Sequence, residues 1–431
     1  IAVTETPNDA GSKMMPLFKS IIRLIRRSDP TTTLVALDTT NTGERRAVLA
    51  ARAAWLLYAL APLITYITPV YLALLAQQVP LTEREIGLLA GAESLGGVIA
   101  ALTARWWITR VNWRAAALAG LLVMIAGIVA TAFTRSPDLL LVIRATASIF
   151  GGGPLIVIAI VVLSESAAPD RNFAYAFAAQ LVIGLVVLLL LPVAGDALGW
   201  TGVIILLAGC FVTALPLVGL LPKRSANPAA LVVPAASLTR PSWLLLLSIA
   251  LLSASTQASW AFSEVLGSDV GMSLSGMSQL LVGSTVLAVV GSLAAAPIGQ
   301  RIGRLRAFIG GTAIILLCVF PLYLVLGPTS YISYYLIGAC ASAFIAPFQL
   351  GALAGQKDAS AAASLMPAVQ AAGMMAGPAA VGLTADTSHG PLWSVSIAVA
   401  FLLLAAPAFA AAIWSRKLNG VPPPQSGTPE T

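Results

Sequence analysis

Long apolar runs dominate this sequence, and short polar segments separate them. A helix that crosses a bilayer needs about 20 mostly apolar residues, because its backbone polar groups must be satisfied within the segment. We predict twelve spanning helices, at residues 53–77, 86–104, 114–133, 139–163, 173–193, 201–221, 242–264, 278–299, 307–326, 330–354, 360–384 and 391–414. The predicted fold class is therefore an all-α integral membrane protein.

Two longer polar segments interrupt this pattern. Residues 1–52 contain no spanning run, and we predict a flexible cytoplasmic tail. Basic and apolar residues interleave within it, so a helix lying on an anionic membrane surface is equally consistent with the pattern. Residues 222–241 are rich in Pro, Ala and Ser and separate spans six and seven. This predicted cytoplasmic linker divides the chain into six-helix blocks at 53–221 and 242–414, with a cytoplasmic tail at 415–431.

Composition and charge narrow the classes of function. The chain is 58% hydrophobic and 10% charged, with a net charge of +7. Soluble domains carry about a quarter charged residues, so a water-soluble core or a disordered chain is disfavoured. The basic excess suits cytoplasmic loops better than a nucleic-acid surface. Apart from Arg84, Arg135 and Arg144, every Lys and Arg falls on the side of the termini and the linker, which predicts that both termini are cytoplasmic.

Residues for catalysis or metal binding are scarce. The cysteines Cys210, Cys318 and Cys340 lie singly in apolar runs, and the one histidine, His389, lies in a predicted turn. This composition favours neither a metal site nor a disulfide framework. No phosphate-binding loop of the Walker type is present, which excludes ATP-driven transport. We therefore expect no enzyme activity, no metal and no cofactor.

The two halves of the chain show an internal repeat. Leu81-Thr82 recurs as Leu274-Ser275 after 193 residues, and Gly97 and Arg110 recur as Gly291 and Arg304 after 194. Thr82 and Glu85 have the spacing of a capping box, which predicts a helix start at this point.

The segment after span eight carries a family resemblance. It reads Ala-Pro-Ile-Gly-Gln-Arg-Ile-Gly-Arg-Leu-Arg over residues 296–306. This resembles the cytoplasmic loop of the major facilitator superfamily, G-x-L-a-D-R-x-G-R followed by Arg or Lys, with Gln300 in place of Asp. Arg144 in span four, followed by small residues, also resembles a motif of this superfamily. The resemblance implies two six-helix bundles related by a pseudo-twofold axis, which alternate access to a central cavity, and a gating role for Gln300, Arg301, Gly303, Arg304 and the first-half counterpart Arg110.

Two charged residues lie deep inside predicted spans, where an ionised group costs several kcal/mol. Glu93 in span two and Arg144 in span four fall at similar depth, so we expect a buried ion pair. Arg144 would then bind an anionic or hydrogen-bond-accepting group of a substrate, with Glu93 as its partner or as a proton carrier. A pair that only holds the two spans together is the alternative. Glu264, at the outer end of span seven, is expected to be a solvated acid.

Uncharged polar and aromatic residues within spans are further candidates. The resemblance implies that spans one, five, seven, ten and eleven line the substrate cavity. Such residues can also serve only in helix packing or as interfacial anchors. The candidates are Tyr58, Tyr66, Gln180, Gln257, Trp260, Gln349 and Gln370.

These features together predict a secondary active transporter of a small organic solute, driven by protons, with efflux favoured over uptake. A proton-coupled uptake symporter for an organic acid is the alternative within this class, and a non-transporting membrane receptor or lipid scramblase is the alternative outside it. The expected partners are the solute, protons and the lipid bilayer, without nucleic acid. We expect a monomer in a bacterial inner or cell membrane.

Overall fold

The computed structural model describes residues 41–225, 238–385, 390 and 392–418, and within these ranges the chain is helical, with no β-strand. Expectations about the N-terminal tail before residue 41, most of the linker and His389 lie outside the described residues. Residues 1–45 and 46–431 form separate units, and the helix bundle belongs to the second unit.

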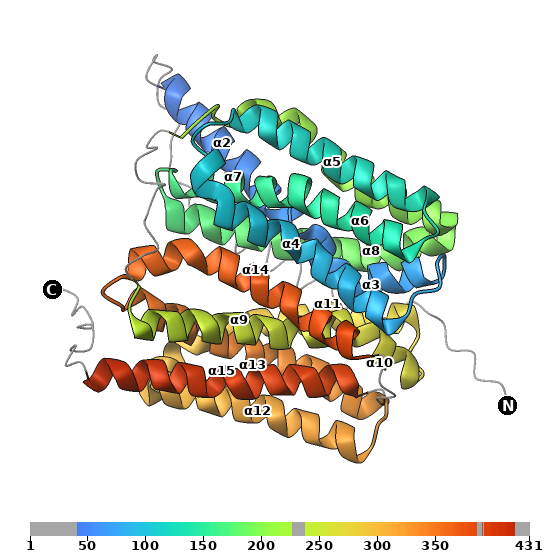
Figure 1. The fold of residues 1–431 in the computed structure, drawn as a ribbon, viewed down its shortest axis with the longest axis vertical. Coiled ribbons are helices and arrows are strands. Elements are labelled where there is room, and N and C mark those ends of the chain that lie inside the picture. Colours follow the sequence, from blue (N-terminus) through green and yellow to red (C-terminus); the bar gives the residue numbers. More distant parts are fainter. Residues whose placement is uncertain (1–40, 226–237, 386–389, 391, 419–431) are drawn as a thin grey trace. The chain divides into compact units, whose positions relative to one another are not determined.

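The first half of this unit covers the first six predicted spans (Figure 1). Span one corresponds to α2 (Asn41–Leu60) and α3 (Leu63–Ala76), span two to α4 (Glu83–Trp107) and span three to α5 (Trp113–Phe133). Span four is α6 (Pro137–Ala147), a π-helical turn η1 (Ser148–Gly152) and α7 (Gly153–Ser164). Spans five and six are α8 (Pro169–Val212), which kinks at Gly199, and the short η2 (Leu215–Leu220).

The second half covers the last six predicted spans (Figure 1). Span seven is α9 (Arg240–Ala261) followed by the short α10 (Ser263–Asp269). The remaining spans are α11 (Leu274–Ile302), α12 (Arg304–Leu324), α13 (Pro328–Ala354), α14 (Ala359–Thr384) and α15 (Trp393–Leu418).

The described helices confirm a multi-span all-α fold, while the number of twelve spans stays a prediction. Ten helical segments of the described chain are long and apolar enough to cross a membrane. One of them, Arg171–Leu220, contains both predicted spans five and six, because the helix continues on both sides of the kink at Gly199. The helix α14 is not among the ten, and its sequence is rich in Ala, Gly, Ser and Pro. The first helix begins at Asn41, well before residue 53, because polar and basic residues extend it beyond its apolar part.

Local sequence signals mark two helix boundaries. The predicted capping box is confirmed: the Thr82 amide donates to Glu85 Oε2 at 2.7 Å, and the Glu85 amide donates to Thr82 Oγ1 at 3.3 Å. Gly303 separates α11 from α12 with φ +83° and ψ 152°, a conformation open almost only to glycine. The loop that carries the family resemblance therefore turns at this glycine.

Replacing Gly303 with Ala should destabilise the protein by about 1–3 kcal/mol, because a Cβ atom strains this backbone conformation. Gly310→Ala is the matched control, since a Cβ atom on either glycine would have open space around it but only Gly303 has positive φ. Gly310 lies in α12, where Ala should be neutral or stabilising. Thermal unfolding of both purified variants measures the difference, and equal melting temperatures would contradict the conformational argument.

One pair of close helix crossings at glycine corresponds between the two halves. A Cβ atom on Gly96 of α4 would lie 1.8 Å from the backbone oxygen of Ser148, and one on Gly291 of α11 would lie 2.0 Å from that of Cys340. Gly97, which the repeat aligned with Gly291, meets only Ala371 Cβ at 3.4 Å. The packing equivalent of Gly291 is therefore Gly96, one residue earlier than the sequence repeat indicated.

The helices run alternately, so the bundle has two ends (Figure 1). We call the end where α4 finishes and α9 and α14 begin the linker end, and the opposite one, with the start of α4 and with α10, the far end. The halves approach closely at the far end. A Cβ atom on Gly87 of α4 would lie 2.4 Å from the oxygen of Pro378, and one on Gly382 of α14 would lie 2.7 Å from the oxygen of Arg84. This approach joins α4 to α14 across the two halves.

Candidate transport cavity

A cavity of about 390 Å³ lies between the two halves. Its walls come from α3 and α8 of the first half and from α9, α11, α13 and α14 of the second. Six of the candidates named from the sequence line it: Tyr66, Gln180, Gln257, Trp260, Gln349 and Gln370. Residues far apart in the chain are thus brought to one space.

The amide side chains in this cavity differ in how they are engaged. Gln349 Nε2 donates to Ser248 Oγ at 2.7 Å, and Ser248 Oγ donates to the Ala405 oxygen at 2.9 Å, so Gln349 is held in place. For Gln180, Gln257 and Gln370, the described part of the chain shows no hydrogen bond to the side-chain amide. These three amides can donate to and accept from a bound solute.

The rest of the lining is apolar or carries hydroxyl groups, and no charged side chain of the described residues lines the cavity. These residues were not among the candidates named above, because Leu, Met, Ser and Thr in a span carry no individual signal. Helical spacing could have found them. Ser253, Thr256, Gln257 and Trp260 follow i, i+3, i+4 and i+7, which places them on one face of α9.

The aromatic pair at the far-end side of the cavity links the two halves. Trp260 Nε1 of α9 donates to the backbone oxygen of Tyr66 in α3 at 3.1 Å. The α9 helix ends directly afterwards at Ala261, and Phe262 leaves the helical conformation before α10 begins. This contact therefore lies between the cavity and the far end.

Glu93 and Arg144 meet as a bidentate ion pair. Arg144 Nε donates to Glu93 Oε1 at 2.5 Å and its second guanidinium nitrogen donates to Oε2 at 2.8 Å, with side chains 1% (Arg144) and 6% (Glu93) exposed. Ser148 Oγ also donates to the backbone oxygen of Glu93 at 2.7 Å. Neither charged residue lines the cavity, because each guanidinium–carboxylate bond directs the two side chains at each other within the first half.

Tyr58 also lies away from the cavity. Its ring packs edge-on against Phe173 of α8, with ring centroids 6.4 Å apart. This contact joins α2 to α8 within the first half.

The expectation that Glu264 is a solvated acid is wrong. The residue is 5% exposed, and neither carboxylate oxygen has a hydrogen-bond partner among the described residues. The cause is the break at Phe262, after which α10 packs against α3, α11 and α13 and carries Glu264 inward. The hydropathy pattern gives no sign of this break.

The residues expected to form a gating loop gather at the linker end. Arg301 and Arg110 are exposed, and Arg304 lies against α13, where a Cβ atom on Gly351 would be 3.6 Å from Arg304 Nε. Gln300 lies in the last turn of α11. Their gating role stays a prediction.

An acidic residue ties the loop before α14 to the start of α9. Asp358 accepts hydrogen bonds from the Thr239 amide and from Ser242 Oγ, each at 2.6 Å. Burial raises the pKa of the Asp358 carboxyl, but these hydrogen bonds lower it by more, so its pKa lies below the ordinary value. The ionised form thus fixes the linker end of the second half.

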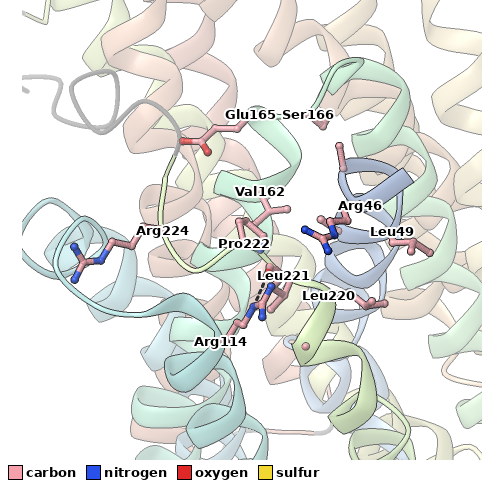
Figure 2. Close-up of a pocket in the computed structure, with 13 residues that line it drawn as sticks. Arg46, Leu49, Arg114, Val162, Glu165, Ser166, Leu220, Leu221, Pro222 and Arg224 are labelled. Atoms are coloured by element: carbon pink, nitrogen blue, oxygen red, sulfur yellow. Dashed lines mark hydrogen bonds between the residues drawn. The ribbon is translucent and has the colours of Figure 1, made fainter. Parts of the chain in front are cut away.

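A second cavity, of about 640 Å³, lies at the linker end of the first half (Figure 2). Arg46 and Arg114 point toward it, whereas the Arg224 side chain is directed away. Arg114 Nε donates to the Leu221 oxygen at 2.6 Å. Its lining comes from the first half and the segment directly after η2, so this cavity does not lie between the halves and is not the candidate transport site.

Comparison with known proteins identifies the family to which this chain belongs. The sequence profile described as Major Facilitator Superfamily matches residues 54–350. The chain belongs to this superfamily. As a member of the major facilitator superfamily it is an integral multi-pass membrane transporter, not an enzyme. No curated protein matches the sequence.

Solved structures of other transporters have a similar fold. A bacterial homolog of the human lysosomal transporter Spinster, in an inward-facing and occupied conformation, is 16% identical with a TM-score of 0.66, over 88% of this chain and 99% of that chain. The nucleoside transporter NupG is 14% identical with a TM-score of 0.65, over 85% and 99%. An auto-inhibited peptide transporter of the POT family is 14% identical with a TM-score of 0.64, over 90% and 99%. At these identities the similarity concerns the fold.

Proposed function

We propose that this superfamily member transports a small, uncharged, amphipathic organic solute through the cavity between its halves. The observation that carries the proposal is the lining that the described residues provide: three amides without partners, several hydroxyl groups, aromatic and aliphatic side chains, and no charge. A charged solute would lose its hydration in this cavity without gaining a counter-charge. Arg144, the cation offered by the sequence for an anionic solute, is already bound to Glu93.

Transport would proceed by alternating access. The halves touch at the far end through α4 and α14 and through Trp260 and Tyr66, whereas Gln349, Met366 and Gln370 line the cavity from the linker-end portions of α13 and α14. With the linker and both termini in the cytoplasm, this arrangement corresponds to an inward-facing state. Rocking of the halves would open the far end.

We propose that protons drive this transport and that its direction is efflux. An uncharged amphipathic solute crosses bilayers unaided, so a gradient-driven carrier has its largest effect in moving the solute outward. Because Glu93 is held by Arg144 through both oxygens, the pair is proposed to brace the first half, and another group would carry the proton. An uptake symporter for an organic acid would instead require a cation that faces the cavity.

Binding of uncharged amphipathic compounds tests the substrate class. A panel of neutral, anionic and cationic organic compounds would be screened for a rise in melting temperature of the purified protein, since ligands that bind the native state stabilise it. We expect stabilisation by neutral compounds. Counterflow of each hit in liposomes then separates a transporter from a receptor or a scramblase, because only a transporter exchanges solute across the bilayer.

Replacing Gln257 or Gln370 with Leu should weaken binding of these hits roughly 5- to 30-fold, because each loses a hydrogen bond worth about 1–2 kcal/mol. Gln356→Leu is the matched control, since Gln356 lies in the loop after α13 and does not line the cavity. Isothermal titration measures the affinities. Unchanged affinity in both cavity variants, or a panel in which only anions bind, would contradict the proposal.

A further inference from the structure

A buried carboxyl group lies beside the contact that closes the far end. Glu264 is 5% exposed, and both carboxylate oxygens lack hydrogen-bond partners in the described part of the chain, as does the neighbouring Ser263 Oγ. Trp260, which binds the Tyr66 oxygen and lines the cavity, precedes Glu264 by four residues. The buried acid therefore lies in the short helix that directly follows the Trp260–Tyr66 contact.

Within the described ranges, no cation faces this carboxyl group from the elements packed against α10. The helices that make the main contacts with α10 are α3, α9, α11 and α13. Their charged residues are Arg240 and Arg301, both at the linker end, and α10 itself carries Asp269, which is exposed at the far end. The titratable groups of α3 and α13 are tyrosines and one thiol: Tyr66, Tyr71, Tyr331, Tyr334, Tyr335 and Cys340. Of these, Tyr331 lies near enough to interact electrostatically with Glu264, and its hydroxyl donates to the Ser263 oxygen at 2.7 Å instead.

The short helix that carries Glu264 fits tightly in its site. A Cβ atom on Gly267 would lie 2.1 Å from Met277 Sδ and 2.8 Å from the Tyr331 hydroxyl. The helix packs against α3 of the first half, so it lies at the interface that must separate when the far end opens. In the closed arrangement, both Glu264 carboxylate oxygens are shielded from solvent.

We infer that Glu264 is a proton-binding site, protonated while the far end is closed and ionised when it opens. An ionised carboxylate without partners is strongly disfavoured in a buried site, whereas the neutral acid is tolerated. Separation of α10 from α3 would hydrate the group and favour release of the proton. Closure of the far end is thereby linked to proton uptake from the far side. This inference rests on the proposed function and identifies a residue that makes opening of the far end depend on the pH of the far side.

The linkage has a definite sign. Protons bind more tightly to the closed far end, so low pH favours closure and rising pH favours opening. Glu264→Gln mimics the protonated acid in shape and charge, so it should keep the far end closed at every pH. Glu264→Asp retains a titratable group and should retain a pH response.

Distances between spin labels at the far end test the inference without any solute. Gln78→Cys, in the turn after α3, and Ser268→Cys, in α10, are both exposed and would carry the labels in a variant with the three native cysteines replaced by Ala. Electron–electron resonance in nanodiscs between pH 5.5 and 8.5 measures the open fraction. We expect it to rise at least threefold with pH in the parent protein and to stay at its low-pH level in Glu264→Gln.

Asp269→Asn is the matched control, because this acid lies on the same short helix but is exposed. It should respond to pH like the parent. A Glu264→Gln protein with the parent's pH response, or a parent without any response, would overturn the inference. If the pH response is lost only in Glu264→Gln while no neutral compound binds, the substrate class fails and the proton site stands. If the solute is exchanged while the far end shows no response to pH, the substrate class stands and the proton site fails.

Discussion

Removal of either charge in the Glu93–Arg144 pair is expected to destabilise the transporter by about 3–5 kcal/mol, because the remaining charge would be left uncompensated in a buried site. Both side chains are almost fully buried and bonded through two hydrogen bonds. The Arg144 guanidinium lies 5.8 Å from the Tyr71 ring, which can offset only a small part of the loss. Glu93→Gln and Arg144→Met are the single changes to compare.

The double variant should cost clearly less than the sum of the two single changes, since it leaves no charge without a partner. Unfolding in a mixed-micelle denaturant series measures all three variants against the parent. Arg110→Gln is the control for loss of a cation, because Arg110 is exposed at the linker end. Additive losses would show that the two residues do not act as one unit.

The same pair shows what the sequence could establish about the site. An apolar helix tolerates a charge only with a partner. Because Glu93 and Arg144 lie at similar depth in two spans, their ion pair was predictable from the sequence. Whether the pair faces the cavity or a neighbouring helix depends on the rotation of α4 and α6 about their axes, which hydropathy does not record. Gln180, Gln257 and Gln370 were predictable for the related reason that an amide avoids lipid, and the cavity is where the three meet.

Other features depend on backbone geometry that composition does not report. The break at Phe262 turns Glu264 from a helix-end acid into a buried one, and the kink at Gly199 joins two predicted spans in one helix. The positive φ of Gly303 was predictable, because a glycine between two basic helix ends indicates a tight turn. The sequence could not predict which of the adjacent glycines Gly96 and Gly97 lies at the close helix crossing, because the two differ only in the direction that each faces.

Gly96→Ala is expected to cost at least ~3 kcal/mol, the upper end of the usual range for overpacking. The added Cβ atom would lie 1.8 Å from the Ser148 oxygen and 2.1 Å from its carbonyl carbon, both backbone atoms that cannot rotate away. The helix α4 and the turn η1 would have to separate, which would also break the hydrogen bond of 2.9 Å from the Gly96 amide to Ser148 Oγ. Ser148 in turn binds the Glu93 oxygen, so the ion pair would lose part of its support.

Gly97→Ala provides a control one residue away on the same helix. Its Cβ atom would meet only the Ala371 methyl group at 3.4 Å, an ordinary contact, and Ala stabilises a helix by up to about 1 kcal/mol relative to Gly. Melting temperatures of the two variants in one detergent should therefore move in opposite directions, or Gly97→Ala should stay near the parent. Because Gly291 makes the equivalent contact with the Cys340 oxygen, Gly291→Ala should reproduce the loss in the second half. A destabilised Gly97→Ala beside an unchanged Gly96→Ala would mean that the crossing of α4 over η1 is not the one described.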